Sequence, residues 1–320
     1  MPGPTRPKVA ILDDYQGVAL RMADWSILDG RAEVVAFDDH LARVDDVVER
    51  LRPFDVVCVM RERTPLTRDV IDRLPNLKLI ASTGRANASI DTAAAAERGI
   101  EVTHTDYSST PTIELTWALI LAMVRNLAIE NRSLRDGGWQ VGLGTELAGK
   151  TLGLLGLGHI GSAVGVIAQA FRMNVIAWSQ NLTAERAAEK GVRLVDKDTL
   201  FGESDILSIH VRLSDRTQGL VGAPELALMR PTSRLVNTSR GPIVDNGALL
   251  AALRQRRIAG AAIDVFDTEP LPLDDPFRSL DNLLATPHIG YVTAEMYRTF
   301  YGDALRHIVA WVESGVRKKP

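Results

Sequence analysis

Short apolar runs alternate with amphipathic segments along the chain. In the first hundred residues, the runs predict buried strands at 8–12, 33–37, 55–60, 77–82 and 100–102. Apolar residues at helical spacing predict helices between them, at 45–51, 67–74 and 91–98. Helix-stopping residues follow these segments, namely Pro53, Pro75 and Gly99. Strands that alternate with short helices favour a parallel sheet covered on both faces.

The same alternation resumes after a long apolar helix, predicted from residue 112 to about residue 135, behind Pro111. Later strands are predicted at 151–155, 175–178, 206–210, 234–237, 261–265 and 283–285. An amphipathic helix from about 293 to 312 has no strand after it, so we expect it to fold back onto the first unit. The predicted domains are therefore a discontinuous one, residues 1–102 plus 293–320, and a second one, residues 103–292.

Length and charge fit a globular chain of two domains. The chain has 320 residues, and 37 Lys and Arg against 40 Asp and Glu give a net charge of −3. This balance predicts neither nucleic acid nor an anionic membrane surface as a partner. The longest apolar stretch, 115–124, is too short to span a bilayer, and the N-terminal residues MPGPTRPK lack the apolar core of a signal peptide. The single cysteine, Cys58, is predicted to be a buried thiol, and we expect a cytoplasmic protein.

The stretch TLGLLGLGHIG, residues 151–161, places three glycines at G-x-G-x-x-G spacing between a strand and a helix predicted at 160–172. This is the context that a dinucleotide-binding fingerprint requires. Gly156 permits the tight turn, Gly158 lets the backbone approach a pyrophosphate, and Gly161 lets the helix pack close to the strand. The helix N-terminus then offers free N–H groups to the phosphates. The alternative is a glycine-rich turn in an ordinary α/β protein.

Three later stretches place polar side chains directly after predicted strands, where ligands bind in open parallel sheets. They are VNTSRG (236–241), DVFDTEP (264–270) and TPHIG (286–290). The guanidinium of Arg240 can clamp a carboxylate in a bidentate manner. His288 is a natural proton donor near neutral pH, and a carboxylate on its second nitrogen favours the imidazolium. Taken singly, the arginine also fits a surface position and the histidine a structural one.

The motifs GLGHIG, NTSRG, DVFDTEP and TPHIG, in this order, resemble those of the D-isomer-specific 2-hydroxyacid dehydrogenase family, and the likeness covers nearly the whole chain. The resemblance implies an α/β fold of two Rossmann-like doubly wound parallel-sheet domains with a cleft between them. Residues 103–292 would form the NAD(P)-binding domain and the remaining residues the substrate (catalytic) domain. It also implies a homodimer.

The resemblance assigns roles to individual residues. Arg240 would hold the substrate carboxylate, His288 would be the acid/base, and Glu269 would be its partner. Backbone amides around Arg85 and Ala86 would bind the substrate carboxylate as well. No metal site is implied. The cofactor would be bound by Gly156, Gly158, His159, Ile160, Gly161, Ser179, His210, Val211, Arg212, Thr238 and Asp264, with Asp264 facing the nicotinamide carboxamide.

Two positions depart from the family pattern. Ser179 stands where an acidic residue usually binds the ribose 2′-OH of NAD. Without that carboxylate a 2′-phosphate is not repelled, and Arg212 is a candidate cation for it, so both NAD and NADP fit. Gly84-Arg85-Ala86 stands where the family usually has Gly-x-Gly, and Ala86 restricts the backbone there. Arg85 either recognises a second anionic group or points to solvent.

These features predict an oxidoreductase that transfers a hydride between a nicotinamide cofactor and a small 2-keto or 2-hydroxy acid, such as glyoxylate, hydroxypyruvate or a phosphorylated hydroxy acid. Oxidation of formate or phosphite and reduction of an imino acid use the same scaffold; formate enzymes of the family pair the histidine with Gln, so Glu269 argues against that branch. A non-catalytic regulator that senses the nucleotide carries the same motifs and is the alternative from another class. Trp117 and Tyr107 either line the substrate pocket or belong to the core.

Overall fold

A computed structural model describes residues 6–317 of the chain. The chain divides into two compact units, one from residues up to Ser108 together with residues from Val292 onward, and the other from Ser109 to Tyr291. The sequence places the two boundaries at 102/103 and 292/293. Part of the stretch used for the signal-peptide prediction, residues 1–5, lies outside the described residues.

The first unit contains a sheet of five parallel strands in the order β2-β1-β3-β4-β5. The strands are β1 (Lys8–Ile11), β2 (Glu33–Ala36), β3 (Val56–Val59), β4 (Leu79–Ser82) and β5 (Glu101–His104). The two central strands β3 and β4 are buried along their whole length, which explains their unbroken apolar sequences. The strand order reverses between β1 and β3, and such a switch point is where ligands bind in doubly wound sheets.

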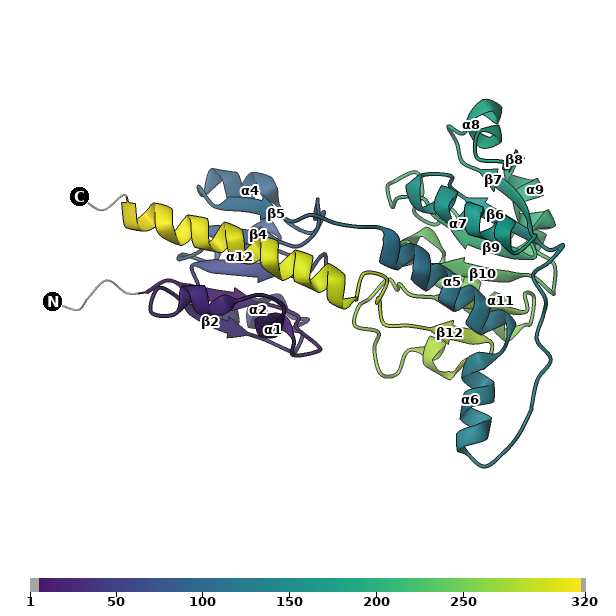
Figure 1. Ribbon diagram of the computed structural model, residues 1–320, viewed down its shortest axis with the longest axis horizontal. Coiled ribbons are helices and arrows are strands. Elements are labelled where there is room, and N and C mark those ends of the chain that lie inside the picture. The colour runs from purple at the N-terminus through teal and green to yellow at the C-terminus, as the bar shows by residue number, and fades with distance from the viewer. Residues whose placement is uncertain (1–5, 318–320) are drawn as a thin grey trace. The chain divides into compact units, whose positions relative to one another are not determined.

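Helices cover this sheet, as the alternation of the sequence predicts (Figure 1). They are α1 (Ala19–Met22), the 3-10 helix η1 (Trp25–Leu28), α2 (Val44–Leu51), α3 (Arg68–Asp72), α4 (Thr92–Glu97) and α12 (Ala294–Arg317). The C-terminal helix α12, which is predicted to fold back onto the first unit, packs against α1, β4 and β5. It continues past residue 312, where the sequence predicts its end.

The second unit contains seven parallel strands in the order β12-β11-β10-β9-β6-β7-β8. They are β6 (Thr151–Leu155), β7 (Asn174–Trp178), β8 (Arg193–Leu194), β9 (Ile206–Ile209), β10 (Arg234–Asn237), β11 (Gly260–Ile263) and β12 (Leu283–Ala285). The order reverses between β6 and β9, which makes the carboxyl end of β6 the switch point of this sheet. The predicted fold class, two doubly wound parallel-sheet domains, is confirmed.

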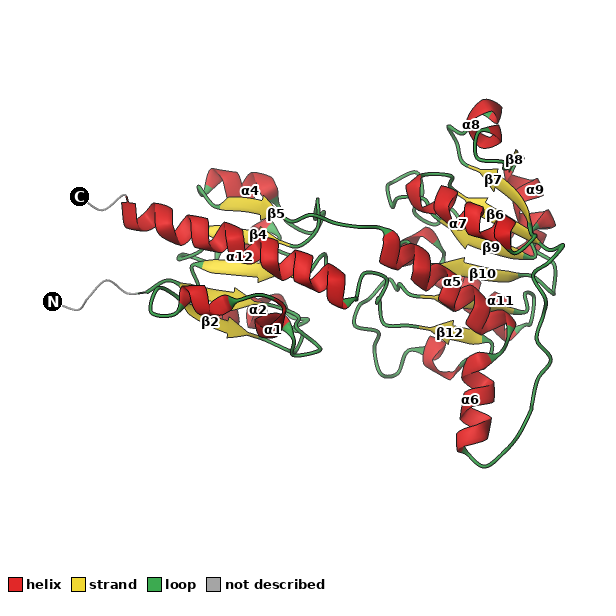
Figure 2. Ribbon diagram, viewed as in Figure 1, coloured by secondary structure: helices red, strands yellow, loops and turns green. Residues whose placement is uncertain are grey.

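The helices of the second unit lie on both faces of its sheet (Figure 2). They are α5 (Thr110–Val124), α6 (Leu127–Arg135), α7 (His159–Ala170), α8 (Ala184–Ala188), α9 (Lys197–Glu203), α10 (Ala223–Leu228), α11 (Asn246–Arg254) and the 3-10 helices η2 (Gly241–Ile243) and η3 (Pro276–Ser279). Within residues 6–317 no single helix is long and apolar enough to cross a membrane; the bent pair α5 and α6 reaches that length and composition only when taken together.

The prediction of one helix from 112 to about 135 is wrong. The helix ends at Val124, and α6 continues at an angle of 62° to α5. Asn126 between them adopts the left-handed conformation, with φ of 55°, which asparagine tolerates better than most residues. Its Nδ2 donates to the carbonyl of Leu143, 3.1 Å away, and the amide of Thr145 donates to the carbonyl of Val124. The following loop therefore folds back and stabilises the bend.

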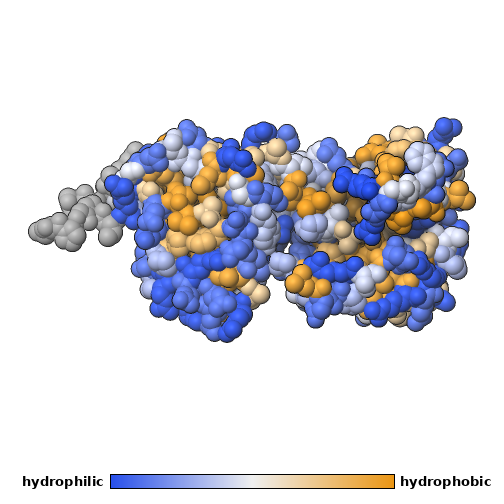
Figure 3. Space-filling view, turned by 90° about the horizontal axis from the view of Figure 1, so that it is seen from below, coloured by the Kyte–Doolittle hydropathy of each residue, from blue (hydrophilic) through white to orange (hydrophobic). Residues whose placement is uncertain are grey.

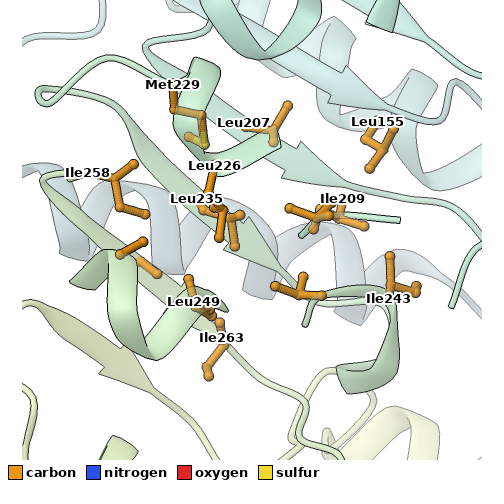
Figure 4. Packing of buried hydrophobic residues seen from close by; sticks show 14 of the residues in the cluster. Leu155, Leu207, Ile209, Leu226, Met229, Leu235, Ile243, Leu249, Ile258 and Ile263 are labelled. Atoms are coloured by element: carbon orange, nitrogen blue, oxygen red, sulfur yellow. The ribbon is translucent and has the colours of Figure 1, made fainter. Parts of the chain in front are cut away.

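Two hydrophobic clusters fill the two faces of the larger sheet. Successive residues of a strand belong to opposite clusters, as the alternating direction of side chains requires. On β10, Leu235 packs on one face and Val236 on the other, and both are fully buried. Figure 4 shows the first of these clusters, in which residues of β6, β9, β10 and β11 meet those of α10 and α11. This core fixes the strand ends that carry the polar motifs.

Candidate active site

The glycine turn lies at the switch point of the seven-stranded sheet, between the end of β6 and the first residue of α7. Gly156 has φ of +102°, and a Cβ on it would lie 2.7 Å from the carbonyl oxygen of His210. A Cβ on Gly161 would lie 2.2 Å from the carbonyl oxygen of Gly156. Gly158 is the N-cap of α7, and a Cβ on it would meet no atom within 4 Å. Gly158 therefore leaves open space in front of the helix N-terminus, which His159 and Ile160 begin.

His210 lies beneath this turn, directly after β9. Its Nε2 is 2.8 Å from the Oγ of Ser208. Burial lowers the pKa of His210 to about 4, because desolvation penalises the charged ring. The imidazole is therefore neutral at physiological pH, and it contacts the glycine turn by packing, since a Cβ on Gly161 would lie 3.4 Å from the Cβ of His210. Val211 and Arg212 follow in the same loop, and the Arg212 side chain is exposed.

Ser179 follows β7 on the other side of β6. The amide of Gly156 donates to the carbonyl of Trp178, 2.9 Å away, so the end of β7 is tied to the glycine turn. Ser179 is half-buried, and its hydroxyl has no hydrogen-bond partner among the described residues. The predicted ribose-binding position thus lies beside the glycine turn with an uncharged, available hydroxyl group.

Arg240 is held in a loop that starts at the end of β10. The Nδ2 of Asn237 donates to the carbonyl of Arg240 at 3.0 Å, and the Oγ of Ser239 donates to the carbonyl of Ile209 at 2.7 Å. The guanidinium Nη1 donates to the carbonyl of Ser239 at 2.8 Å. Gly241 follows, and a Cβ there would lie 2.2 Å from the backbone of Phe266. The Arg240 loop is therefore in backbone contact with the loop that carries Glu269.

Glu269 and His288 lie in direct contact. The Nδ1 of His288 is 2.6 Å from the Oε2 of Glu269, so a proton on Nδ1 is donated to the carboxylate. The other oxygen of Glu269, Oε1, accepts from the amide of Phe266 at 2.9 Å. Both side chains are partly exposed, His288 by 17% and Glu269 by 24%. This contact fixes the tautomer of His288, with the proton on Nδ1 facing Glu269.

Asp264, at the end of β11, is buried and holds the backbone beside His288. Its Oδ1 accepts from the Oγ1 of Thr286 at 2.6 Å and from the amide of Ile289 at 2.8 Å. Its Oδ2 accepts from the amide of Gly290 at 2.8 Å. Burial raises the pKa of Asp264, while these hydrogen bonds oppose the rise. Asp264, which is predicted from the sequence to face the nicotinamide, therefore also holds the loop that carries His288.

The predicted substrate loop lies in the first unit, after β4. Gly84 has φ of +85°, and a Cβ on it would lie 1.7 Å from Nη1 of Arg61. That guanidinium reaches the carbonyls of Thr83 and Ala86 at 3.4 and 3.5 Å. Among the residues with a described position, the amides of Arg85 and Ala86 have no acceptor and the Arg85 guanidinium has no ion pair. The structure thus places Arg85 and Ala86 in the first unit, and Arg240, Glu269 and His288 together in the second.

Two threonines near these loops, Thr112 and Thr116, are not predicted from the sequence. Thr238, a predicted cofactor residue, is 2.8 Å from Thr116 between their hydroxyl oxygens, and Thr112 bonds the carbonyl of Gly290 at 3.1 Å. These partners are far apart in the chain, and no local pattern marks a threonine on an apolar helix as functional. Trp117 is a core residue, since it is 5% exposed and stacks on Phe171 with ring centroids 5.0 Å apart.

Other residues around these loops have structural surroundings. Tyr107 lies under the guanidinium of Arg61, whose carbon is 5.3 Å from the ring centroid. Over residues 6–317 no group of three or more His, Cys, Asp or Glu side chains is placed to hold a metal ion. The carboxyl edge of the larger sheet thus carries a histidine–glutamate pair, an arginine and a glycine turn.

Known proteins match this arrangement over most of the chain. The profile of the D-isomer specific 2-hydroxyacid dehydrogenase, NAD binding domain, matches residues 117–290. A hydroxypyruvate reductase of Thermotoga maritima is 39% identical over 278 residues, which are 85% of this chain and 89% of that protein. A D-3-phosphoglycerate dehydrogenase of Methanocaldococcus jannaschii is 41% identical over 255 residues, 78% of this chain, and the match spans only 48% of that relative.

The fold also matches that of solved structures. The crystal structure of a phosphoglycerate oxidoreductase from Vibrio cholerae superimposes with a TM-score of 0.92 at 38% identity, and the match covers 96% of this chain and 99% of that one. This match covers residues of both units, and the NAD-binding profile matches within the second one. The chain therefore belongs to the D-isomer-specific 2-hydroxyacid dehydrogenase family.

Proposed function

We propose that the protein transfers a hydride between a nicotinamide cofactor and a small 2-keto or 2-hydroxy acid, with His288 as acid/base, Glu269 as its partner and Arg240 as the carboxylate clamp. The contact of 2.6 Å between Glu269 and His288 carries this proposal. It stands at the same edge of the sheet as the glycine turn and the Arg240 loop, where ligands of open α/β sheets bind.

Each of these residues would have a different role in the reduction. A nicotinamide cofactor held at the glycine turn would supply the hydride for the carbonyl carbon of the keto acid. Arg240 holds the carboxylate and places positive charge beside the carbonyl oxygen as that oxygen becomes an alkoxide. His288 gives the proton on Nε2 to this oxygen, and Glu269 stabilises the imidazolium before the transfer. In oxidation the same proton returns to His288.

For the cofactor we propose use of both NAD and NADP. The NAD-binding profile covers the glycine turn, and Ser179 places a neutral hydroxyl where an acidic residue would select NAD. Such a hydroxyl neither repels a 2′-phosphate nor binds the 2′-OH as strongly as a carboxylate does. Arg212 is exposed in the loop after β9, which lies on the other side of β6 from β7, and we propose it as a candidate cation for a 2′-phosphate.

We propose that the first unit binds the substrate. There the guanidinium of Arg85 would bind a second anionic group, so the enzyme would prefer keto acids that carry one. This guanidinium is exposed and has no ion pair in the described part of the chain, whereas Arg61 is held by the loop carbonyls. Arg85→Gln should then raise KM about 10-fold or more for dianionic keto acids, the size of a charged hydrogen bond, and leave KM for glyoxylate unchanged. No effect on either substrate would mean that Arg85 points to solvent, and an equal rise for both would mean that it binds the carboxylate they share.

We further propose a homodimer that forms through α6 and the loop after it. Large apolar side chains are exposed there, by 49 to 95%, at Leu127, Ile129, Leu134, Trp139, Val141 and Leu143. A groove of about 570 Å³ lies in the same unit between the α5–α6 bend and β12. Figure 3 shows orange hydrophobic residues on the surface of this unit. Exposed apolar patches of this kind mark protein contacts.

The oligomeric state can be measured by analytical ultracentrifugation. The wild type should sediment as a dimer, and the double change Trp139→Ser with Leu143→Ser should weaken the dimer at least 10-fold, given about 25 cal/mol for each Å² of apolar surface. A monomeric wild type, or an unchanged dissociation constant in the variant, would contradict the proposal. The cytoplasmic location expected from the sequence stays a prediction.

Cofactor oxidation with a panel of keto acids tests the function itself. The wild type should oxidise NADH or NADPH with at least one of glyoxylate, hydroxypyruvate and phosphorylated keto acids, and Arg240→Lys should lose most of the turnover while binding cofactor normally, because lysine lacks the planar fork. Tight cofactor binding without turnover on any keto acid would instead support the nucleotide-sensing regulator. Turnover that appears only when an amine is added would support the imino-acid reductase.

A further inference from the structure

Thr112, in the first turn of α5, reaches the loop that carries His288. Its Oγ1 donates to the carbonyl oxygen of Gly290 at 3.1 Å, across 178 residues of sequence. Thr112 is buried, with 8% of its surface exposed. The amide of the same Gly290 donates to Asp264 at 2.8 Å. Both polar backbone groups of residue 290 are therefore fixed, one by β11 and the other by α5.

The histidine loop needs such support, because its backbone is strained. His288 has φ of 52°, in the left-handed region that only a few per cent of non-glycine residues adopt, although histidine is found there more often than most. Conformations of this kind cost about 1–3 kcal/mol and persist only where the surroundings hold them. The loop has little space to relax, since a Cβ on Gly290 would lie 3.1 Å from Oδ2 of Asp264 and 3.5 Å from Oγ1 of Thr112.

The anchor on α5 is itself fixed. One turn along the helix, the Oγ1 of Thr116 donates to the carbonyl of Thr112 at 2.8 Å and lies 2.8 Å from the Oγ1 of Thr238. Thr116 is fully buried. The helix thus bonds to the end of β10 through Thr116 and to the histidine loop through Thr112. Two hydroxyl groups on one helix face hold two of the strand-end loops of the site.

We propose that Thr112 is a positioning residue for the acid/base His288, which it serves by fixing the peptide of Gly290. This inference rests on the proposed function. Proton transfer requires the imidazole Nε2 within about 3 Å of the substrate oxygen, and a displacement of about 1 Å reduces turnover by up to 10²-fold. Asp264 fixes the amide side of the loop, and without Thr112 the carbonyl side of Gly290 is released from α5.

The change Thr112→Val tests the proposal, because valine keeps the shape of threonine and removes the donor. We expect kcat for keto-acid reduction to fall about 10- to 100-fold, while KM and the Kd for cofactor change less than about threefold. Amide hydrogen exchange at Ile289 and Gly290 should become at least about 10-fold faster. Thr112→Ser restores the hydroxyl group and should return both measurements to within about threefold of the wild type.

Thr103→Val is the matched control. The Thr103 hydroxyl oxygen is buried in the first unit and has no hydrogen-bond partner in the described structure, so its removal should change neither kcat nor the exchange of the loop amides. Thr112→Ala is the second variant if the valine variant does not fold. Thr112 variants that keep wild-type kcat and wild-type exchange at 289 and 290 overturn the proposal, as does a serine variant that rescues neither.

The two measurements separate this inference from the proposed function. If the wild type reduces no keto acid, the function fails, and the exchange of the Ile289 and Gly290 amides still decides whether Thr112 holds the loop. If the wild type is active and Thr112→Val matches it, the function stands and the positioning role is refuted. A fall in kcat with unchanged exchange would also refute it, because the effect would then not pass through Gly290.

Discussion

Replacing Gly158 with alanine separates the cofactor role of the glycine turn from its structural role. Gly158 is the N-cap of α7, with φ of −79° and ψ of −160°, a conformation open to any residue. A Cβ added there meets no atom within 4 Å. Alanine is a poorer N-cap than glycine, which costs at most about 1 kcal/mol. The variant should therefore fold with nearly the stability of the wild type.

Cofactor binding should respond much more strongly than stability. The pyrophosphate of a dinucleotide approaches the backbone at the middle glycine of the fingerprint, where the added methyl group would stand. Forcing one methyl group into a packed contact costs about 1–3 kcal/mol, which corresponds to a Kd about 5- to 150-fold higher. The free energy lost from binding should thus exceed that lost from folding by a clear margin.

Gly161→Ala is the matched control, because its effect should be reversed. The new Cβ would lie 2.2 Å from the carbonyl oxygen of Gly156, a backbone atom that cannot move without disturbing the turn, so the free energy of unfolding should fall by about 1–3 kcal/mol. Fluorescence titration with NADH and NADPH gives Kd, and urea unfolding gives stability. A Kd for Gly158→Ala within twofold of the wild type would refute pyrophosphate binding at the N-terminus of α7.

Three further predictions concern charge. Ser179→Asp should shift the ratio of kcat/KM toward NADH by about 1–3 kcal/mol, and a wild type that already prefers NADH more than a thousandfold would contradict the assignment of Ser179. In Glu269→Gln, His288 loses the carboxylate that it contacts at 2.6 Å, so kcat for keto-acid reduction should fall about 10-fold or more, and a variant with wild-type kcat would separate Glu269 from His288. Burial lowers the pKa of His210 to about 4 from the ordinary 6.5. Between pH 6.5 and 4, the unfolded chain therefore binds a proton at His210 that the folded chain does not bind. The free energy of unfolding should fall by about 3 kcal/mol from about pH 7 to 4 because of this residue. Urea unfolding of His210→Gln should show a correspondingly flatter dependence on pH, and a slope equal to that of the wild type would refute the buried neutral ring.

The strand ends could be predicted from the sequence for a physical reason. A strand of a covered parallel sheet is buried on both faces, so it appears as a short unbroken apolar run, and the polar residue that follows it must lie at the carboxyl edge. That is why Arg240 and His288 could be placed at one edge of the sheet before any coordinates. The contact of Glu269 with His288 follows less directly, because it depends on how two loops fold above that edge.

The bend at Asn126 could not be predicted in the same way. The apolar pattern runs through it without interruption, and no proline or glycine marks the break. What ends α5 is a set of distant bonds, from the Asn126 side chain to Leu143 and from the Thr145 amide to Val124. Such bonds override local helix propensity, which is worth only tenths of a kcal/mol for each residue. The apolar surface that α6 and its loop expose follows from this bend.

The position of His288 also depends on distant bonds. The TPHIG motif places His288 after β12, but its left-handed backbone is held by Asp264 from β11 and by Thr112 from α5. Thr112 belongs to none of the four motifs, and nothing in its neighbourhood distinguishes it from a threonine that fills a helix. A related chain with all four motifs and valine at this position would therefore keep the family fold and lose proton-transfer geometry. The motifs decide membership of the family, whereas turnover depends also on residues that only the folded chain brings beside them.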